Sequence, residues 1–372
     1  MIQESVKRLL HRVNNEDNHT REFPPSIYMA PSVLRDLSPS SFNPRLVSIG
    51  PLHREDENVK AFEGQKISYL INLMSRINFP QEEILESCMQ KAYSVMNEIK
   101  GCYIWTKTYT DAEIAEMMVL DACFIIGFIM DQHVLYHKKT YMGKGLQNRT
   151  IMKDLVLLEN QIPLFFLDQM FQCTVLKYRT DISFIEFIKP VLKSHKLFKA
   201  DLKFDDVSFG TNDHFLSLLH QCYMPPARPT LTMPVLFIQD STELLFRNLI
   251  AYEQSFQTQG YVTSYAFVMD MLVNTHDDVA KLVESKVLVN YMGSNEEVAN
   301  MINNIGKNVI VSNSCYEEEW EKLMKYCNRY WPKHIAKMKS TYFSSPWSII
   351  ALVAGIILFV LQALQTIFTI KS

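Results

Sequence analysis

Three polar residues, Glu159, Asn160 and Gln161, stand together inside an apolar stretch and are followed by Ile162 and Pro163. We refer to the three as the Glu159 cluster. The apolar residues around it recur at helical spacing: Ile151, Leu155, Leu158, Ile162 and Phe165. A stripe of this kind faces a protein core, so the cluster should be buried. A buried carboxylate with a perturbed environment can serve catalysis or ligand binding.

The Glu159 cluster also has a structural interpretation. Each buried polar group that lacks a hydrogen bond costs about 1–3 kcal/mol. Pro163 disfavours a helix that continues through Ile162, and it suits the first turn of a new helix. The sequence therefore predicts a helix break whose freed backbone groups are satisfied by Glu159, Asn160 and Gln161. We favour this interpretation over a catalytic or ligand-binding role for Glu159.

The string RNLIAYEQ, residues 247–254, supplies two more charged residues in an apolar setting. We expect Arg247 and Glu253 to join the Glu159 cluster in a buried polar network. The alternative is a hydrolase or transferase site near Glu159, His53 and Arg247. Convergent titratable groups in a cleft would favour the enzyme, whereas a sealed polar network would favour a protein that binds partners.

Other chemistry finds little support in the sequence. The motifs GxSxG, GxxxxGK[ST], GxGxxG and HExxH do not occur, and Gly143-Lys144-Gly145 predicts a turn. His133 and His137 are four residues apart but have no evident third ligand. Asp277-Asp278 suits the start of a helix. We therefore expect no catalytic residues, no metal site and no cofactor.

The composition limits the class of protein. The chain has 372 residues, of which 48% are hydrophobic and 21% charged, and its formal net charge is −3. This length suffices for one large domain or two. No overall basic field would attract nucleic acid. The 7 cysteines are odd in number, widely spaced and without a CxxC motif, so we expect reduced thiols in a cytosolic compartment.

Hydrophobic periodicity predicts a mainly helical globular domain with a few short strands. The predicted helices cover residues 1–13, 63–77, 80–99, 111–137, 151–176 with a break at Pro163, 181–197, 242–258, 261–273, 276–284, 294–305 and 315–340. Short strands are predicted at Leu46–Ile49 and Val235–Ile238, and an irregular stretch at 202–234. We expect an N-terminal helix and polar linker over 1–22, and a globular domain over 23–340 with a weak lobe boundary near 200–234.

The last segment predicts a transmembrane helix. Residues 347–370 comprise 24 residues without a charge, which is roughly 36 Å of helix and enough to cross a bilayer. The basic residues that precede it are Lys325, Arg329, Lys333, Lys337 and Lys339, whereas Lys371 alone follows. Because cytoplasmic flanks are richer in Lys and Arg, we expect a single-pass C-terminal anchor with the N-terminal domain in the cytosol.

Over most of its length the chain resembles the plant family known as domain of unknown function 247. The matching strings are Phe42-Asn43-Pro44, Val47 to Pro51, Glu63 and Lys66, Leu120 to Phe124, Asp154 to Pro163, Phe246 to Gln254, Thr263 to Tyr265, Tyr342-Phe343 and Pro346-Trp347. The strings LLENQIP and RNLIAYEQ are specific in combination. The resemblance implies a plant membrane protein without assigned enzymatic activity. Some grass relatives are implicated in self-incompatibility, and others in defence or growth.

The sequence departs from the family pattern at several places. Family members usually have Tyr at position 42, Gly at position 122 and Tyr-His-His in place of Leu52-His53-Arg54. The section between Leu219 and Pro234 is also shorter than is usual in the family. From the resemblance and the apolar C-terminal segment, we expect a membrane-anchored plant protein that binds unknown protein partners in signalling or recognition. The membrane-tethered hydrolase or transferase remains the alternative.

Overall fold

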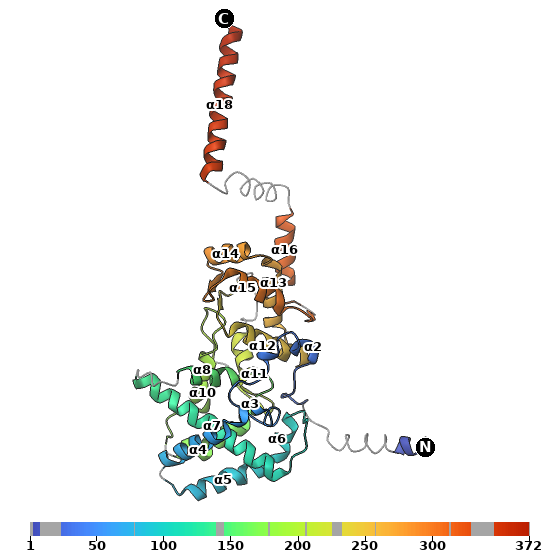
Figure 1. The fold of residues 1–372 in the computed structure, drawn as a ribbon, viewed down its shortest axis with the longest axis vertical. Helices are drawn as coiled ribbons and strands as arrows, with labels where there is room; N and C mark the ends of the chain where they lie inside the picture. Colours follow the sequence, from blue (N-terminus) through green and yellow to red (C-terminus); the bar gives the residue numbers. More distant parts are fainter. Residues whose placement is uncertain are drawn as a thin grey trace. The chain divides into compact units, whose positions relative to one another are not determined.

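The computed structural model divides the chain into two compact units, Met1–Ser314 and Cys315–Ser372 (Figure 1). The structure describes residues 3–7, 24–77, 79–138, 145–177, 179–204, 207–224, 233–256, 258–311, 314–328 and 346–371. Residues 3–7 are helical, and the remainder of the predicted N-terminal helix and linker lies outside the described residues. The predicted lobe boundary near 200–234 stays a prediction.

The first unit is built around one long helix, α7 (Asp111–Lys138). The helices that pack against it are α4 (Glu63–Arg76), α5 (Gln81–Ser94), α9 (Leu164–Cys173) and α10 (Phe184–Lys193). The middle of α7 is apolar on all sides, and Cys123–Ile126 are fully buried. This helix is therefore a core helix, as its sequence predicts.

A second group of elements completes this unit (Figure 1). Its helices are α12 (Thr242–Phe256), α13 (Tyr261–Leu272), α14 (His276–Glu284) and α15 (Asn295–Ile305). Strand β1 (Leu236–Ile238) pairs in parallel with β2 (Leu288–Asn290), with Phe237 opposite Val289. All four helices and β1 were expected from the sequence, whereas β2 was not.

The shorter elements include several that the sequence did not predict. They are α2 (Ser32–Arg35), η1 (Pro39–Ser41), α3 (Glu57–Lys60), α6 (Met96–Cys102), α8 (Gly145–Asp154), η2 (Val175–Lys177) and α11 (Phe215–Tyr223). Helix α11 interrupts the stretch predicted to be irregular. It begins in a capping box in which the His214 ring accepts from the Ser217 amide and Ser217 Oγ accepts from the His214 amide.

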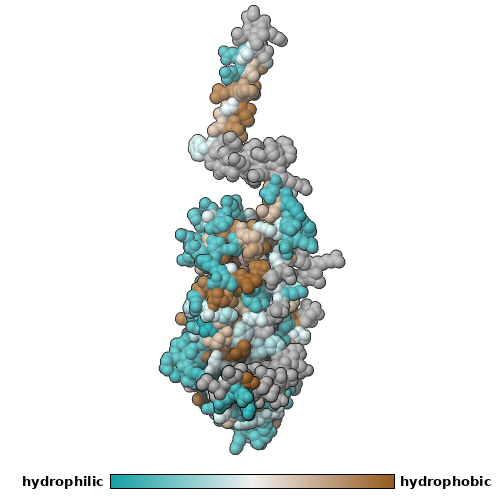
Figure 2. Space-filling model, turned by 90° about the vertical axis from the view of Figure 1, so that its right-hand side faces the viewer, coloured by the Kyte–Doolittle hydropathy of each residue, from teal (hydrophilic) through white to brown (hydrophobic). Residues whose placement is uncertain are grey.

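The second unit contains α16 (Glu317–Cys327) and α18 (Pro346–Lys371). The rest of the helix predicted over 315–340 lies outside the described residues. Among the described residues, α18 is the helix that is long and apolar enough to cross a membrane, and none of Ile349–Thr366 is buried in the protein. Most of the side chains coloured along α18 are hydrophobic (Figure 2). The predicted mainly helical class with a C-terminal apolar helix is confirmed.

Candidate functional site: a buried polar network

The chain between α8 and α9 is buried but not helical. Helix α8 ends at Asp154, and α9 begins after Pro163, which is its N-cap residue. The predicted helical stripe is therefore wrong over 155–162, although the predicted break at Pro163 is present. A buried segment without regular structure needs partners for its amides and carbonyls from outside the segment or from side chains.

Two amide side chains of the Glu159 cluster satisfy much of this backbone. Asn160 Nδ2 donates to the carbonyl of Asp154 at 2.9 Å. Gln161 Nε2 donates to the carbonyls of Leu155 at 2.8 Å and Leu157 at 2.7 Å. Asn160 and Gln161 thus close the freed turn after α8, as the structural interpretation of the cluster expected.

The same segment holds the extended chain at 45–50 in place. Asp154 accepts hydrogen bonds from the amides of Arg45, Leu46 and Val47 at 3.0, 2.8 and 3.0 Å. Asn160 Oδ1 accepts from the amide of Ile49 at 2.6 Å. The strand predicted at Leu46–Ile49 is therefore wrong, because these amides bond to side chains instead of to a neighbouring strand.

The extended segment ends at Gly50, whose φ of +69° lies in the left-handed region. A Cβ at this position would lie 2.9 Å from Tyr103 Oη and 3.0 Å from the carbonyl oxygen of Gln161. The Gly50 amide donates to Asp121 Oδ2 at 2.8 Å. Glycine is thus required by both its conformation and its close neighbours.

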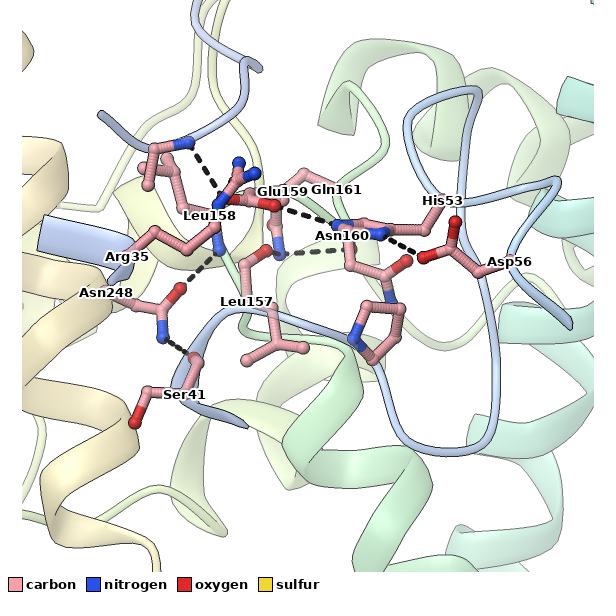
Figure 3. Close-up of polar contacts among 12 residues, drawn as sticks. Arg35, Ser41, His53, Asp56, Leu157, Leu158, Glu159, Asn160, Gln161 and Asn248 are labelled. Atoms are coloured by element: carbon pink, nitrogen blue, oxygen red, sulfur yellow. Dashed lines mark hydrogen bonds and ion pairs between the residues drawn. The ribbon is translucent and has the colours of Figure 1, made fainter. Parts of the chain in front are cut away.

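Glu159 itself does not bond to the freed backbone around it. Its side chain is fully buried, and Oε1 accepts from the Ala30 amide at 2.8 Å and from Arg35 Nη2 at 2.6 Å. Its Oε2 lies 2.9 Å from His53 Nε2, and His53 Nδ1 lies 2.7 Å from Asp56 Oδ2 (Figure 3). Glu159 therefore binds Ala30, Arg35 and His53 of the N-terminal segment and holds them at the core of the unit.

The environment of His53 favours its charged form. Burial lowers the pKa of His53, but the hydrogen bonds to Glu159 and Asp56 outweigh burial and raise it overall. The imidazolium would then lie between two carboxylates, with Arg35 on the far side of Glu159.

A second buried ion pair was not recognised in the sequence. Lys66 and Asp121 are both fully buried, with Lys66 Nζ 2.6 Å from Asp121 Oδ1 and from Glu63 Oε1. Lys66 also donates to the Ser48 carbonyl at 2.6 Å. Burial raises the pKa of Asp121 even though Lys66 lowers it. The signal available in the sequence was a charge at a core position of each helix.

The structure does not bring Arg247 and Glu253 to the Glu159 cluster. Arg247 Nε donates to Glu243 Oε1 at 2.8 Å on its own helix. Glu253 accepts from the amides of Val262 and Thr263 at 2.9 and 2.7 Å, so it caps α13. It also bonds to His220 at 2.7 Å.

The link between α12 and the cluster is Asn248, which sequence reasoning missed. Asn248 Oδ1 accepts from the Leu158 amide at 2.7 Å, and Nδ2 donates to the Ser41 carbonyl at 2.6 Å (Figure 3). This one amide therefore joins α12, η1 and the segment before Glu159. Within RNLIAYEQ the sequence drew attention to the charged residues, but the contact with the cluster is made by the neutral Asn248.

The arrangement suits structural support better than acid–base chemistry. Both oxygens of Glu159 are engaged, and neither Glu159 nor His53 is exposed by more than 3%. Arg247, the third residue of the alternative enzyme site, makes its hydrogen bonds elsewhere. In the part of the chain that the structure describes, no group of three or more His, Cys, Asp or Glu residues could hold a metal.

Comparison with known proteins identifies the family. The model of a plant protein family of unknown function, DUF247, matches residues 27–230 and 227–361. UPF0481 protein At3g47200 of Arabidopsis thaliana is 23% identical over 93% of this chain and 86% of its own length. Putative UPF0481 protein At3g02645 of the same plant is 21% identical over 94% and 91%. No solved structure is significantly similar. The chain therefore belongs to the DUF247 family of plant proteins of unknown function.

Proposed function

We propose that this protein is a membrane-anchored interaction protein whose helical first unit presents a surface to protein partners. The observation that carries the proposal is α18, whose 26 residues would cover roughly 39 Å, more than a hydrocarbon core. Its apolar side chains are exposed, among them Ile357 at 54% and Leu358 at 66%. Such a helix needs an apolar environment.

The charges around α18 support a cytosolic first unit. Five Lys or Arg residues lie at positions 325–339, whereas Lys371 alone follows the apolar stretch. This bias orients a single span with the N-terminal side in the cytosol. The odd number and wide spacing of the seven cysteines agree with a reducing compartment.

The sealed Glu159 cluster supports an interaction protein over the hydrolase or transferase. A general base must reach a substrate proton directly or through one water, and Glu159 is fully buried behind Arg35 and His53. Exposed apolar side chains of the first unit, such as Val33 at 51% and Ile310 at 74%, offer contact area instead. Recognition in self-incompatibility would be one form of such an interaction.

Alkaline carbonate extraction of membranes that carry the full chain tests the anchor. We expect the wild-type protein to remain in the membrane pellet. The double variant Ile357→Lys and Leu358→Lys places two charges in the span at about 2.5–3.5 kcal/mol each, so it should be released. The control is Ile357→Leu with Leu358→Ile, which should remain in the pellet. Release of the wild-type protein would contradict the anchor.

Proximity labelling with the full chain tests the interaction role. The labelled proteins should be recovered with the wild-type chain and lost when exposed apolar residues of the first unit, Val33 and Ile310, are changed to Asp. Equal labelling by both chains would contradict a role for this surface. Substrate turnover that depended on Glu159 in a folded variant would instead favour the enzyme.

A further inference from the structure

Two polar residues of α18 share one helix face with two small residues. Ala351, Gly355, Gln362 and Thr366 follow one another at intervals of four, seven and four residues, and we refer to them as the polar face of α18. Intervals of four and seven residues return to the same side of an α-helix. The opposite side carries large apolar residues that are exposed: Val353, Ile357, Val360 and Leu364.

The side-chain amide of Gln362 has no hydrogen-bond partner among the residues that the structure describes. By contrast, the Thr366 hydroxyl donates to the Gln362 carbonyl on the same helix at 2.8 Å. Gln362 is exposed and lies four residues before the end of the apolar stretch Ile349–Thr366, which is roughly 6 Å inside that end. In a bilayer there is no water at this depth, so a partner for the amide has to come from another membrane helix.

Gly355 leaves the same face open to a close approach. A Cβ added at this position would meet no neighbouring atom within 4 Å. The backbone of Gly355 is helical and its φ is negative, so its conformation does not require glycine. Glycine inside a helix is also less favourable than alanine. Small residues such as Gly355 and Ala351 let the backbones of two membrane helices come close together, which gives a reason for a glycine here.

We propose that α18 associates, through its polar face, with α18 of a second copy of this chain in the same membrane. The inference rests on the membrane anchor proposed above. Two copies inserted with the same orientation place Gln362 at the same depth. A side-chain amide both donates and accepts hydrogen bonds, so a two-fold pair lets each Gln362 bond to the other. A helix of an unrelated protein would need a donor and an acceptor of its own at this depth, whereas a second copy always supplies them.

Resonance energy transfer between full chains in liposomes tests the association. One population carries a donor fluorescent protein fused to its N-terminus, and the other carries an acceptor. The two are mixed at a series of protein-to-lipid ratios, so that the concentration of the chain in the bilayer is varied. We expect transfer that rises with this concentration as a monomer–dimer equilibrium predicts. An excess of unlabelled full chain should abolish the transfer.

Variants of the polar face separate association through α18 from association through the first unit. Gln362→Leu should weaken dimerisation about tenfold, because it removes the bonds between the two amides. It makes the span more apolar, so a failure to insert cannot cause the loss. Gln362→Asn keeps an amide and should restore most of the association. Gly355→Leu should weaken dimerisation as well, since its side chain separates the two backbones. The matched control, Val360→Leu, adds bulk to the opposite side and should associate as the wild type does.

Carbonate extraction of the same liposomes distinguishes failure of this inference from failure of the anchor. Release of the wild-type chain would overturn both proposals. A wild-type chain that is retained but shows no transfer dependent on its concentration would overturn the dimer alone. The dimer is also overturned if Gln362→Leu and Gly355→Leu associate as tightly as Val360→Leu. Loss of transfer in Gln362→Leu with recovery in Gln362→Asn would support it.

Discussion

His53 Nε2 and Glu159 Oε2 lie 2.9 Å apart, and both side chains are buried although 106 residues separate them in the sequence. This contact ties the irregular N-terminal segment to the chain between α8 and α9. Asp154 and Asn160 extend the same connection to residues 45–49. Buried side chains therefore take the place of a sheet in holding this segment.

The charged state of His53 should make the stability of the first unit depend on pH. Its pKa in the folded protein is raised above the unfolded value of about 6.5. The stabilisation that charged His53 contributes is then fully present below about pH 6.5. It is lost as pH rises through the pKa of His53 in the folded protein, and the free energy of unfolding falls by up to about 1.4 kcal/mol per pH unit.

Denaturation midpoints between pH 5.5 and 8.5 check this prediction. The difference in stability between the wild type and His53→Gln should shrink as pH rises. His276→Gln changes a histidine that is 66% exposed, and it should leave the pH dependence unaltered. A difference between wild type and His53→Gln that stays constant across this range would contradict a charged His53.

Glu159→Gln should lower the stability of the first unit more than it lowers any binding activity. The substitution keeps the shape but removes the charge that faces Arg35 and His53. Loss of one partner from a fully buried ion pair costs about 3–5 kcal/mol. Because Arg35 is 25% exposed, we expect a smaller loss of about 1–3 kcal/mol in the free energy of unfolding.

Chemical denaturation of Glu159→Gln measures this loss. The matched control is Glu57→Gln, since the Glu57 side chain is 88% exposed, and it should change stability by less than about 0.5 kcal/mol. A variant with unchanged stability that had lost partner binding would assign Glu159 a direct functional role instead.

Asp154→Asn should loosen the extended segment selectively. One carboxylate oxygen is replaced by an amide nitrogen, which cannot accept from the amides of residues 45–47. The rate of amide hydrogen exchange should increase at these three amides and stay unchanged in α7. The control, Asp277→Asn, changes an aspartate that is 74% exposed and should leave the exchange rates as they are. Uniform acceleration throughout the unit would contradict a local role.

Most of the helices were predictable because their apolar periodicity is regular. The helices α4, α7 and α12 to α15 appear within a few residues of their expected bounds. The 155–162 segment has the same helical periodicity but is not a helix, since side-chain amides take over the bonds of its backbone. Helix α11 was missed because the prolines that follow it dominated the pattern.

The composition of the candidate site was more predictable than its contacts. The sequence indicated that Glu159, Asn160 and Gln161 are buried and hydrogen-bonded. It did not indicate Arg35, which lies 124 residues from Glu159 in the chain. Contacts over such separations follow from the packing of whole elements, which local periodicity does not encode. The expectation that Arg247 would join the cluster failed for the same reason.

The membrane topology of the full chain is the central claim, and glycosylation mapping in microsomes tests it most directly. An Asn-Ser-Thr acceptor appended after Ser372 should be glycosylated, because the proposed orientation would place that end in the lumen. The native acceptor at Asn148 should remain unmodified in the same chain, because the first unit would lie in the cytosol. Glycosylation at Asn148 without modification of the appended acceptor would contradict the proposed orientation and place the first unit outside the cytosol.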